Sequence, residues 1–249
     1  MEERTQDYRL VTTAEDLSAV AETLRSAEAI GVDIETTALS PRDGGMRLLQ
    51  LATPEETFVI DAFEISDLSP LTEVLEGGTV KVGHNLKFDY QFLHAIYGIS
   101  LSPLFDTMLA AQVLDGGNYA VSYSLEALVE RYLDESLDKS EQRSDWSGQL
   151  SEAQLEYAAQ DARVLLPLRD RLAASLEEEE LGRISRIEFE AVAAIAEMEL
   201  AGVKLDVARW KELEVRVHER RDCRHRFARI QPSPSSGGKN RRARTTRRQ

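Results

Sequence analysis

The sequence predicts an α/β fold with a mixed central sheet flanked by helices, and two observations predict it. Strand-like segments with alternating apolar residues come in quick succession before residue 83. Segments with apolar residues three or four positions apart dominate from residue 88 onward, as expected for helices. The 249 residues are 42% hydrophobic and 30% charged, which is globular composition and excludes a disordered protein.

The expected strands lie in the first third of the chain. Leu49 and Leu51 alternate with their neighbours as in a strand that buries one face. The turn-like sequence Ser-Pro-Arg-Asp-Gly-Gly at residues 40–45 separates two strands, which indicates an antiparallel meander. We expect strands at Tyr8–Val11, Ala29–Glu35, Arg47–Ala52, Thr57–Ile60 and Val80–Val82.

The expected helices follow the apolar spacing and its capping residues. Thr12 or Thr13 is a candidate N-cap for a helix that contains Leu17 and Leu24. The longest expected helix, Ser151–Leu176, begins with Ser151 and Gln154 at the positions of a capping box. Further helices are expected around Pro70–Leu75, Phe88–Ile96, Leu109–Val113, Leu125–Tyr132 and Arg183–Leu200.

The formal net charge of −14 is spread unevenly along the chain. Residues 216–249 contain 12 arginines and lysines against two acids, so the remainder is strongly acidic. An acidic body is unusual for a protein that grips duplex nucleic acid with its main surface. The apolar period ends after Glu214, and Pro, Ser and Gly residues lead into the arginine-rich end, which predicts disorder there.

The number of cysteines and the longest apolar stretches indicate the cellular compartment. The single cysteine excludes a disulfide framework and a cysteine-cluster zinc site. Residues 1–30 show no signal segment, and Glu197 and Glu199 interrupt the most apolar stretch, Ala191–Val203. We therefore expect a cytoplasmic protein that does not bind membranes.

Three short sequence patterns contain acidic residues that are candidates for a functional site. Asp33 and Glu35 are two positions apart on an expected strand, so both face the same side of the sheet, and a solvated edge is the alternative. In Gly83–Asp89 an expected strand ends and an expected helix begins, with Asn85 as a candidate cap. Asp89 lies one turn inside this helix, and the alternative is that it only interacts favourably with the helix dipole.

The third pattern lies on the longest expected helix. Tyr157 and Asp161 are four residues apart and therefore share a face, and alanines beside them allow another element to approach closely. An exposed tyrosine–aspartate pair is the alternative. If all four carboxylates meet in one cleft, divalent cations must neutralise them, and an all-oxygen ligand set suits Mg²⁺ or Mn²⁺. Such sites are typical of phosphoryl transfer.

The three patterns also carry a family resemblance. Asp33-x-Glu35, Asn85-x-x-x-Asp89 and Tyr157-x-x-x-Asp161, in this order, resemble the motifs of the DEDD 3′–5′ exonucleases. They fit the tyrosine-containing branch shared by ribonuclease D and the proofreading domain of family A DNA polymerases. The resemblance spans Tyr8–Leu176 and includes Phe105–Ala111. It implies a ribonuclease H-like (DnaQ-like) exonuclease fold.

The resemblance also implies roles for individual residues. Asp33, Glu35, Asp89 and Asp161 are expected to hold two Mg²⁺ or Mn²⁺ ions. Tyr157 is expected to orient the attacking water, because a phenol with a pKa of ~10 is a poor base at neutral pH. The residues expected to contact substrate are Thr36, His84, Asn85 and Lys87, although a helix cap explains Asn85 equally well.

The expected reaction is hydrolysis of terminal phosphodiesters in single-stranded nucleic acid, with release of nucleoside 5′-monophosphates. DNA is the first choice and a proofreading role in DNA replication is implied, because Glu188–Leu213 resembles the start of a family A polymerase region. Ribonuclease D-like trimming of RNA 3′ ends and a non-catalytic nucleic-acid-binding module are the alternatives. A DNA polymerase is the implied protein partner.

Three segments are therefore expected. Residues 1–180 form the exonuclease domain, residues 181–215 a helical segment that resembles the polymerase start, and residues 216–249 a basic, disordered tail. The change of character after Glu214 has two explanations. One is a truncation or reading-frame change in the gene, and the other is a basic arm that anchors nucleic acid by releasing counterions.

Overall fold

The computed structural model describes residues 7–118, 120–138, 140–141 and 144–230, with the backbone alone at residues 222–230. The chain divides into two compact units, Met1–Ala201 and Gly202–Gln249. Every element discussed for the sheet and its helices belongs to the first unit.

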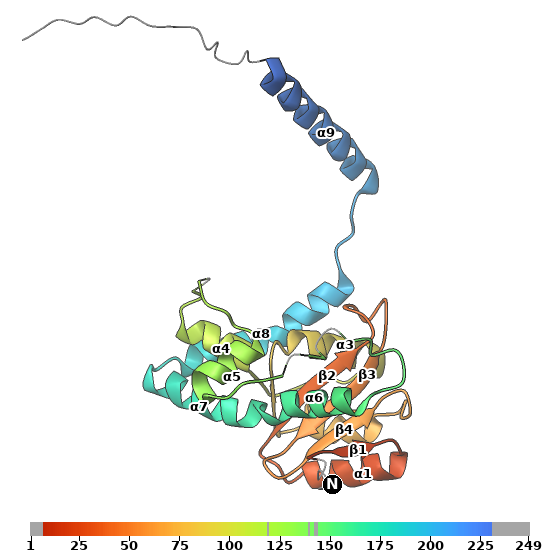
Figure 1. Ribbon diagram of the computed structural model, residues 1–249, viewed down its shortest axis with the longest axis vertical. Helices are drawn as coiled ribbons and strands as arrows, with labels where there is room; N and C mark the ends of the chain where they lie inside the picture. The colour runs from red at the N-terminus through yellow and green to blue at the C-terminus, as the bar shows by residue number, and fades with distance from the viewer. Residues whose placement is uncertain (1–6, 119, 139, 142–143, 231–249) are drawn as a thin grey trace, which may run out of the picture. The chain divides into compact units, whose positions relative to one another are not determined.

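A six-stranded mixed sheet forms the centre of the first unit (Figure 1). Its order is β1-β4-β3-β2-β5-β6, with antiparallel pairing of β2 with β3 and of β3 with β4. The other neighbours pair in parallel. The expected meander is thus confirmed, and the strands are β1 (Arg9–Val11), β2 (Ala29–Thr36), β3 (Met46–Ala52), β4 (Thr57–Asp61), β5 (Val80–Gly83) and β6 (Leu104–Asp106).

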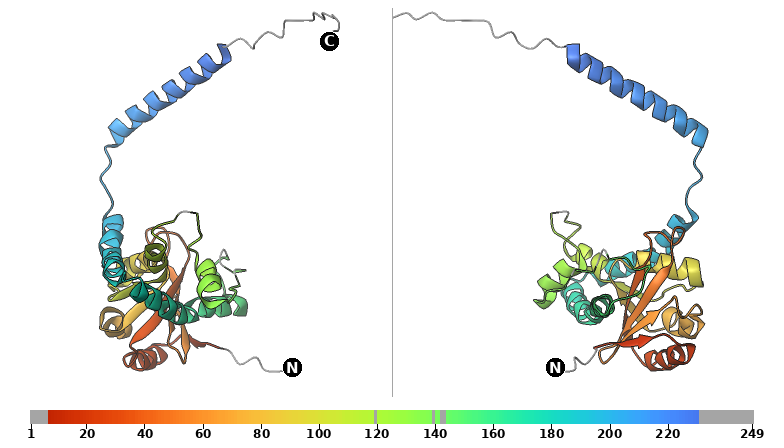
Figure 2. Two further views of the ribbon diagram at one scale, coloured as in Figure 1. Left: turned by 90° about the vertical axis from the view of Figure 1, so that its left-hand side faces the viewer. Right: turned by 45° about the vertical axis from the view of Figure 1, so that its right-hand side comes forward.

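Helices cover both faces of this sheet (Figure 2). One face carries α1 (Ala14–Leu24), the 3₁₀ turn η1 (Ser69–Leu71), α2 (Thr72–Glu76) and α3 (Lys87–Tyr97), which share an apolar core with Ile30, Val32 and Ile34. The other face carries α4 (Thr107–Leu114), α5 (Leu125–Leu133), α6 (Glu152–Arg163) and α7 (Leu165–Glu178). Helix α8 (Gly182–Ala201) contacts β6, α3, α4 and α7.

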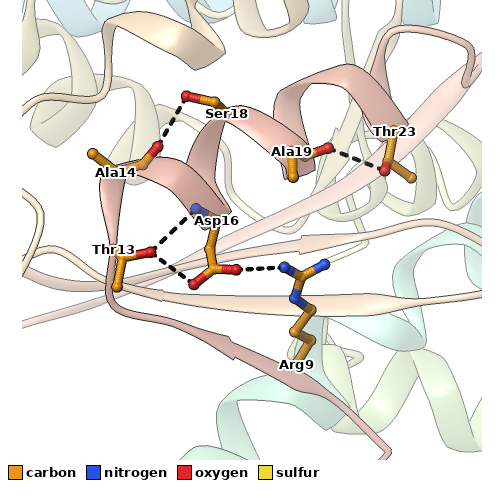
Figure 3. Close-up of polar contacts among 7 residues, drawn as sticks. All are labelled: Arg9, Thr13, Ala14, Asp16, Ser18, Ala19 and Thr23. Carbon is orange, nitrogen blue, oxygen red and sulfur yellow. Dashed lines mark hydrogen bonds and ion pairs between the residues drawn. The ribbon is translucent and has the colours of Figure 1, made fainter.

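The start of α1 shows how a predicted cap is built (Figure 3). Thr13 is the N-cap, and its Oγ1 accepts a hydrogen bond from the Asp16 backbone N–H at 3.1 Å. The same hydroxyl donates to Asp16 Oδ2 at 2.7 Å, while Arg9 donates to Asp16 Oδ1 at 2.7 Å. An N-cap of this kind satisfies an otherwise unpaired N–H of the first turn.

The expected helix Ser151–Leu176 is wrong in one respect, because it is two helices. The capping box of Ser151 and Gln154 is present, but α6 ends at Arg163 and α7 begins at Leu165. Pro167 explains the break, since its ring would clash with the carbonyl of Arg163 in a continuous helix. In α7, Pro167 lies in the first turn, where no intrahelical N–H bond is lost.

The two units divide the chain near its carboxyl end. Helix α8 belongs to the first unit, so this unit extends to Ala201 and not to residue 180. In the second unit, α9 runs from Val207 to Ile230 and includes residues 216–230, for which disorder was expected. The remainder of the expected tail, 231–249, lies outside the described residues. Across the described part of the chain, no helix is long and apolar enough to span a bilayer.

Candidate active site

The first acidic pair lies on β2, at the centre of the sheet. Because Ile30, Val32 and Ile34 face the α1 side, Asp33 and Glu35 face the side covered by α6. Asp33 pairs in register with Gln50 on β3, and Glu35 pairs with Leu48. A register shift follows between Glu35 and Thr36, so the strand becomes irregular just beyond the acidic pair.

Helix α6 brings the tyrosine and the last aspartate to the same face. It crosses the sheet over β2, β3 and β4 (Figure 1). A Cβ added at Gly31 would lie 2.5 Å from the Ala162 carbonyl oxygen, so the glycine permits direct contact between strand and helix. Ala158, Ala159 and Ala162 are fully buried, which confirms that small residues allow the close approach. Tyr157 and Asp161 are buried on this helix.

The second motif follows β5, which runs parallel to β2 and ends at the same edge of the sheet. Asn85 adopts a left-handed backbone conformation with φ of 61°, and Leu86 is the N-cap of α3. The expectation that Asn85 caps this helix is therefore wrong. Asp89 lies in the first turn of α3, is buried, and accepts hydrogen bonds from its own backbone and from that of Ile34.

Carboxylates of one motif shift the pKa values of side chains in the others. Burial and then the Asp33 carboxylate raise the pKa of Asp89 well above its ordinary value. Burial and the Asp161 carboxylate, which hydrogen-bonds the hydroxyl, raise the pKa of Tyr157, and Glu35 and Asp33 raise it further. Asp33 thus acts on both Asp89 and Tyr157, so residues from β2, α3 and α6 face a common space.

This set of side chains fits a hard divalent cation. The donors are carboxylate oxygens, which Mg²⁺ and Mn²⁺ prefer, and their mutual repulsion favours a neutralising charge. Within the described part of the chain, no three acidic, histidine or cysteine side chains form a ready-made metal cluster. Holding a cation would therefore require these side chains to move toward one another, and the ligand assignment stays a prediction.

The residues expected to bind substrate lie around the same edge of the sheet but have other contacts. Thr36 Oγ1 donates to the Ala38 carbonyl at 2.7 Å, and Lys87 Nζ pairs with Glu199 Oε1 at 2.7 Å. The His84 ring contacts Thr107 Oγ1 through Nδ1 at 3.0 Å. Thr36, His84, Asn85 and Lys87 are all partly exposed, so their role in substrate binding stays a prediction.

Two polar residues near the motifs were not singled out from the sequence. Asp106, at the end of β6, is 1% exposed and accepts four backbone hydrogen bonds. Gln50 is fully buried beside Asp33, and neither polar atom of its amide has a hydrogen-bond partner. An Asp-Thr pair that opens a helix is a usable signal for Asp106. Gln50 lies in an apolar strand, and the sequence around it gives no signal that would single it out.

The chain is similar to known proteins of one family. A family model described as a 3′–5′ exonuclease matches residues 8–177. DNA polymerase I of Aquifex aeolicus is 36% identical over an alignment of 220 residues, and the match covers 81% of this chain and 36% of that protein. Ribonuclease D of Escherichia coli is 32% identical over 173 residues, which are 69% of this chain and 45% of that protein. The chain thus spans less than half the length of either relative.

Solved structures show the same fold. The crystal structure of Escherichia coli ribonuclease D has a TM-score of 0.71 and 30% identity, and the match covers 77% of this chain and 51% of that one. Brucella melitensis NrnC with bound Mg²⁺ has a TM-score of 0.65 and 26% identity, with coverage of 71% and 87%. These matches confirm the expected ribonuclease H-like fold. The chain belongs to the 3′–5′ exonuclease family that contains ribonuclease D and the exonuclease domain of DNA polymerase I.

Proposed function

We propose that this protein is a two-metal-ion 3′–5′ exonuclease that removes nucleotides from single-stranded DNA. The observation that carries the proposal is the central position of Asp33 on β2, where its carboxylate raises the pKa of both Asp89 on α3 and Tyr157 on α6. Buried carboxylates that repel one another are costly for a fold unless a cation neutralises their charge.

In the proposed site each side chain has one task. Asp33, Glu35 and Asp161 would hold one cation, and Asp33 and Asp89 would hold a second. The bound cations would lower the pKa of a water molecule and stabilise the leaving 3′ oxygen. Tyr157 would orient that water through its hydroxyl, and its raised pKa means that the hydroxyl keeps its proton at neutral pH.

The length of the polymerase match favours DNA as substrate. The match to DNA polymerase I extends over 220 residues, compared with 173 for ribonuclease D. Trimming of RNA 3′ ends is the second candidate, because ribonuclease D is similar in both sequence and structure. A partner DNA polymerase stays a prediction from the family resemblance alone.

The test is digestion of matched DNA and RNA oligonucleotides, each labelled once at the 5′ end and once at the 3′ end. With Mg²⁺, the 5′-labelled DNA is expected to shorten stepwise, whereas the 3′-labelled DNA should release labelled mononucleotide at once. EDTA and Asp33→Ala are each expected to abolish both signals. Digestion that survives either treatment contradicts the proposal, and faster digestion of RNA would select the second candidate.

A further inference from the structure

Asp106 occupies an unusual position between two elements of the site. Its Oδ1 accepts hydrogen bonds from the backbone N–H groups of Met108 at 2.9 Å and Leu109 at 3.1 Å, and it thereby caps α4. The same oxygen accepts from Asn85 N–H at 3.2 Å, and Oδ2 accepts from Leu86 N–H at 2.7 Å. One buried carboxylate therefore joins the start of α4 to the turn that precedes α3.

That turn needs an external restraint. Asn85 has a positive φ, which is uncommon for a residue other than glycine. The N-cap of α3 is Leu86, whose side chain makes no capping hydrogen bond. Hydrogen bonds to a charged carboxylate are stronger than those between neutral groups. Asp106 thus supplies from a different strand the restraint that a local cap usually supplies.

Thr107 adds a second link between the same segments. Its Oγ1 donates to the Gly83 carbonyl at 3.0 Å. Because a hydroxyl has only one proton, the contact of Thr107 Oγ1 with His84 Nδ1 must be an N–H donated by the histidine ring. Residues 83–86 are therefore held by two consecutive side chains of another segment.

The consequence concerns Asp89, which lies three residues after Leu86 in the first turn of α3. A displacement of the turn would move the start of α3 and carry Asp89 away from Asp33. We propose that Asp106 is a positioning residue, which acts through the backbone of Asn85 and Leu86 to place Asp89 for cation binding. This inference rests on the proposed function, since it assumes that Asp89 binds a metal.

A purely electrostatic role for Asp106 predicts the opposite result. Its charge raises the pKa of Asp89, although burial and Asp33 have larger effects. Neutralising Asp106 without moving the turn would make Asp89 easier to ionise and would strengthen cation binding. Loss of the positional restraint would weaken cation binding. The sign of the change therefore separates the two roles.

The test variant is Asp106→Asn. The amide oxygen is expected to stay at the Oδ1 position, where three N–H groups converge, so the cap of α4 remains. The amide NH₂ group then faces the N–H of Leu86, and this contact between two donors breaks the bond that holds the turn. Mn²⁺ binding, measured by titration calorimetry, is expected to weaken about 10- to 100-fold, as is typical when an outer-shell partner of a ligand is lost.

Thr13→Ala is the matched control, because Thr13 caps α1 and its hydrogen bonds are made to residues of α1 (Figure 3). It is expected to lower stability while Mn²⁺ binding stays unchanged. Equal or tighter Mn²⁺ binding by Asp106→Asn would overturn the proposal. Should that variant not fold, Asp106→Ser keeps a side-chain oxygen that can cap α4 and removes the acceptor for the Leu86 N–H. It is expected to weaken Mn²⁺ binding at least threefold, and unchanged binding would overturn the proposal equally.

Calorimetry also keeps this inference separate from the proposed function. If no oligonucleotide is digested although Mn²⁺ binds and Asp106→Asn weakens the binding, the proposed reaction is wrong and the positioning role stands. If digestion and metal dependence are normal in Asp106→Asn, the positioning role is wrong and the proposed reaction stands.

Discussion

Tyr157 illustrates how its surroundings determine what one side chain can do. It packs against Trp146, with ring centroids 6.4 Å apart, and its hydroxyl is hydrogen-bonded to Asp161. Burial together with three nearby carboxylates keeps the phenol protonated. The hydroxyl can therefore donate and accept hydrogen bonds, but it is a poor general base.

Tyr157→Phe is expected to lower kcat about 10- to 100-fold, since a hydrogen bond that orients a reacting group contributes at the lower end of general acid–base effects. KM and the affinity for Mn²⁺ should change less than threefold, because the aromatic packing remains. Steady-state kinetics on a single-stranded oligonucleotide measures both parameters. An increase of KM with unchanged kcat would instead assign Tyr157 to substrate binding.

Gln50 gives a prediction about stability. Its buried amide lacks hydrogen-bond partners, and an unsatisfied polar group of this kind costs about 1–3 kcal/mol. Gln50→Met has a similar shape without polar atoms, so the free energy of unfolding should rise by about 1–2 kcal/mol. Urea denaturation measures the change. A decrease would mean that ordered water or a bound ligand satisfies the amide.

The individual site residues differ in how well the sequence predicts them. The placement of Asp33 and Glu35 on one face follows from strand periodicity, and that of Tyr157 and Asp161 follows from helical periodicity. The backbone of Asn85 could not be predicted, because its positive φ depends on bonds to Asp106, which lies about 20 residues away. Long-range hydrogen bonds leave no local periodicity.

At the scale of elements, the contact between β2 and α6 decides the geometry of the site. Gly31→Ala places a methyl group against the carbonyl of Ala162, and this overpacking is expected to cost about 1–3 kcal/mol of stability. Because α6 carries Tyr157 and Asp161, a shift of this helix should also lower kcat. Thermal unfolding and nuclease assays on the same preparation measure the two effects.

Gly78→Ala is the control for this substitution, because nothing lies within 4 Å of a Cβ added there. It is expected to change stability by less than about 1 kcal/mol and to leave kcat unaltered. Similar losses of stability and kcat in the two variants would show that the effect at Gly31 does not come from the contact between β2 and α6.

Some helices and strands can be predicted from the sequence better than others, and the reasons are physical. The five expected strands and the caps at Thr13 and Ser151 are present, since they depend on local alternation and on residues three positions apart. Strand β6 was missed, because its sequence Leu-Phe-Asp does not alternate between apolar and polar residues. The break between α6 and α7 was missed although Pro167 is its cause, since apolar residues continue at helical spacing across it.

At the scale of the whole molecule, Lys81 links the stability of the fold to pH. Its buried Nζ donates to the carbonyls of Val74 at 3.1 Å, Gly77 at 3.0 Å and Thr79 at 2.5 Å, and also to that of Ser102. Burial nevertheless lowers the pKa of Lys81 to about 8. An unfolded lysine titrates near 10.4, so between about pH 8 and 10 the unfolded chain binds more protons than the folded one.

The free energy of unfolding, relative to that of Lys81→Met, should therefore rise with pH by about 1 kcal/mol per unit between pH 8 and 10. Below about pH 7 the difference should be flat, because Lys81 is protonated in both states there. Urea denaturation at half-unit intervals measures it. A flat difference across the whole range would show that the four carbonyls offset the cost of burial.

The position of α8 matters for anyone who prepares the nuclease on its own. The family match ends at residue 177, whereas the folded unit continues to Ala201. Helix α8 buries Phe189, Val192 and Ala196 against the rest of the first unit. The Tyr90 hydroxyl of α3 also donates a hydrogen bond to Glu197 of α8 at 2.9 Å. A gene fragment cut at the end of the family match would expose this apolar surface and would favour inclusion bodies, so an expression clone should retain the whole of α8.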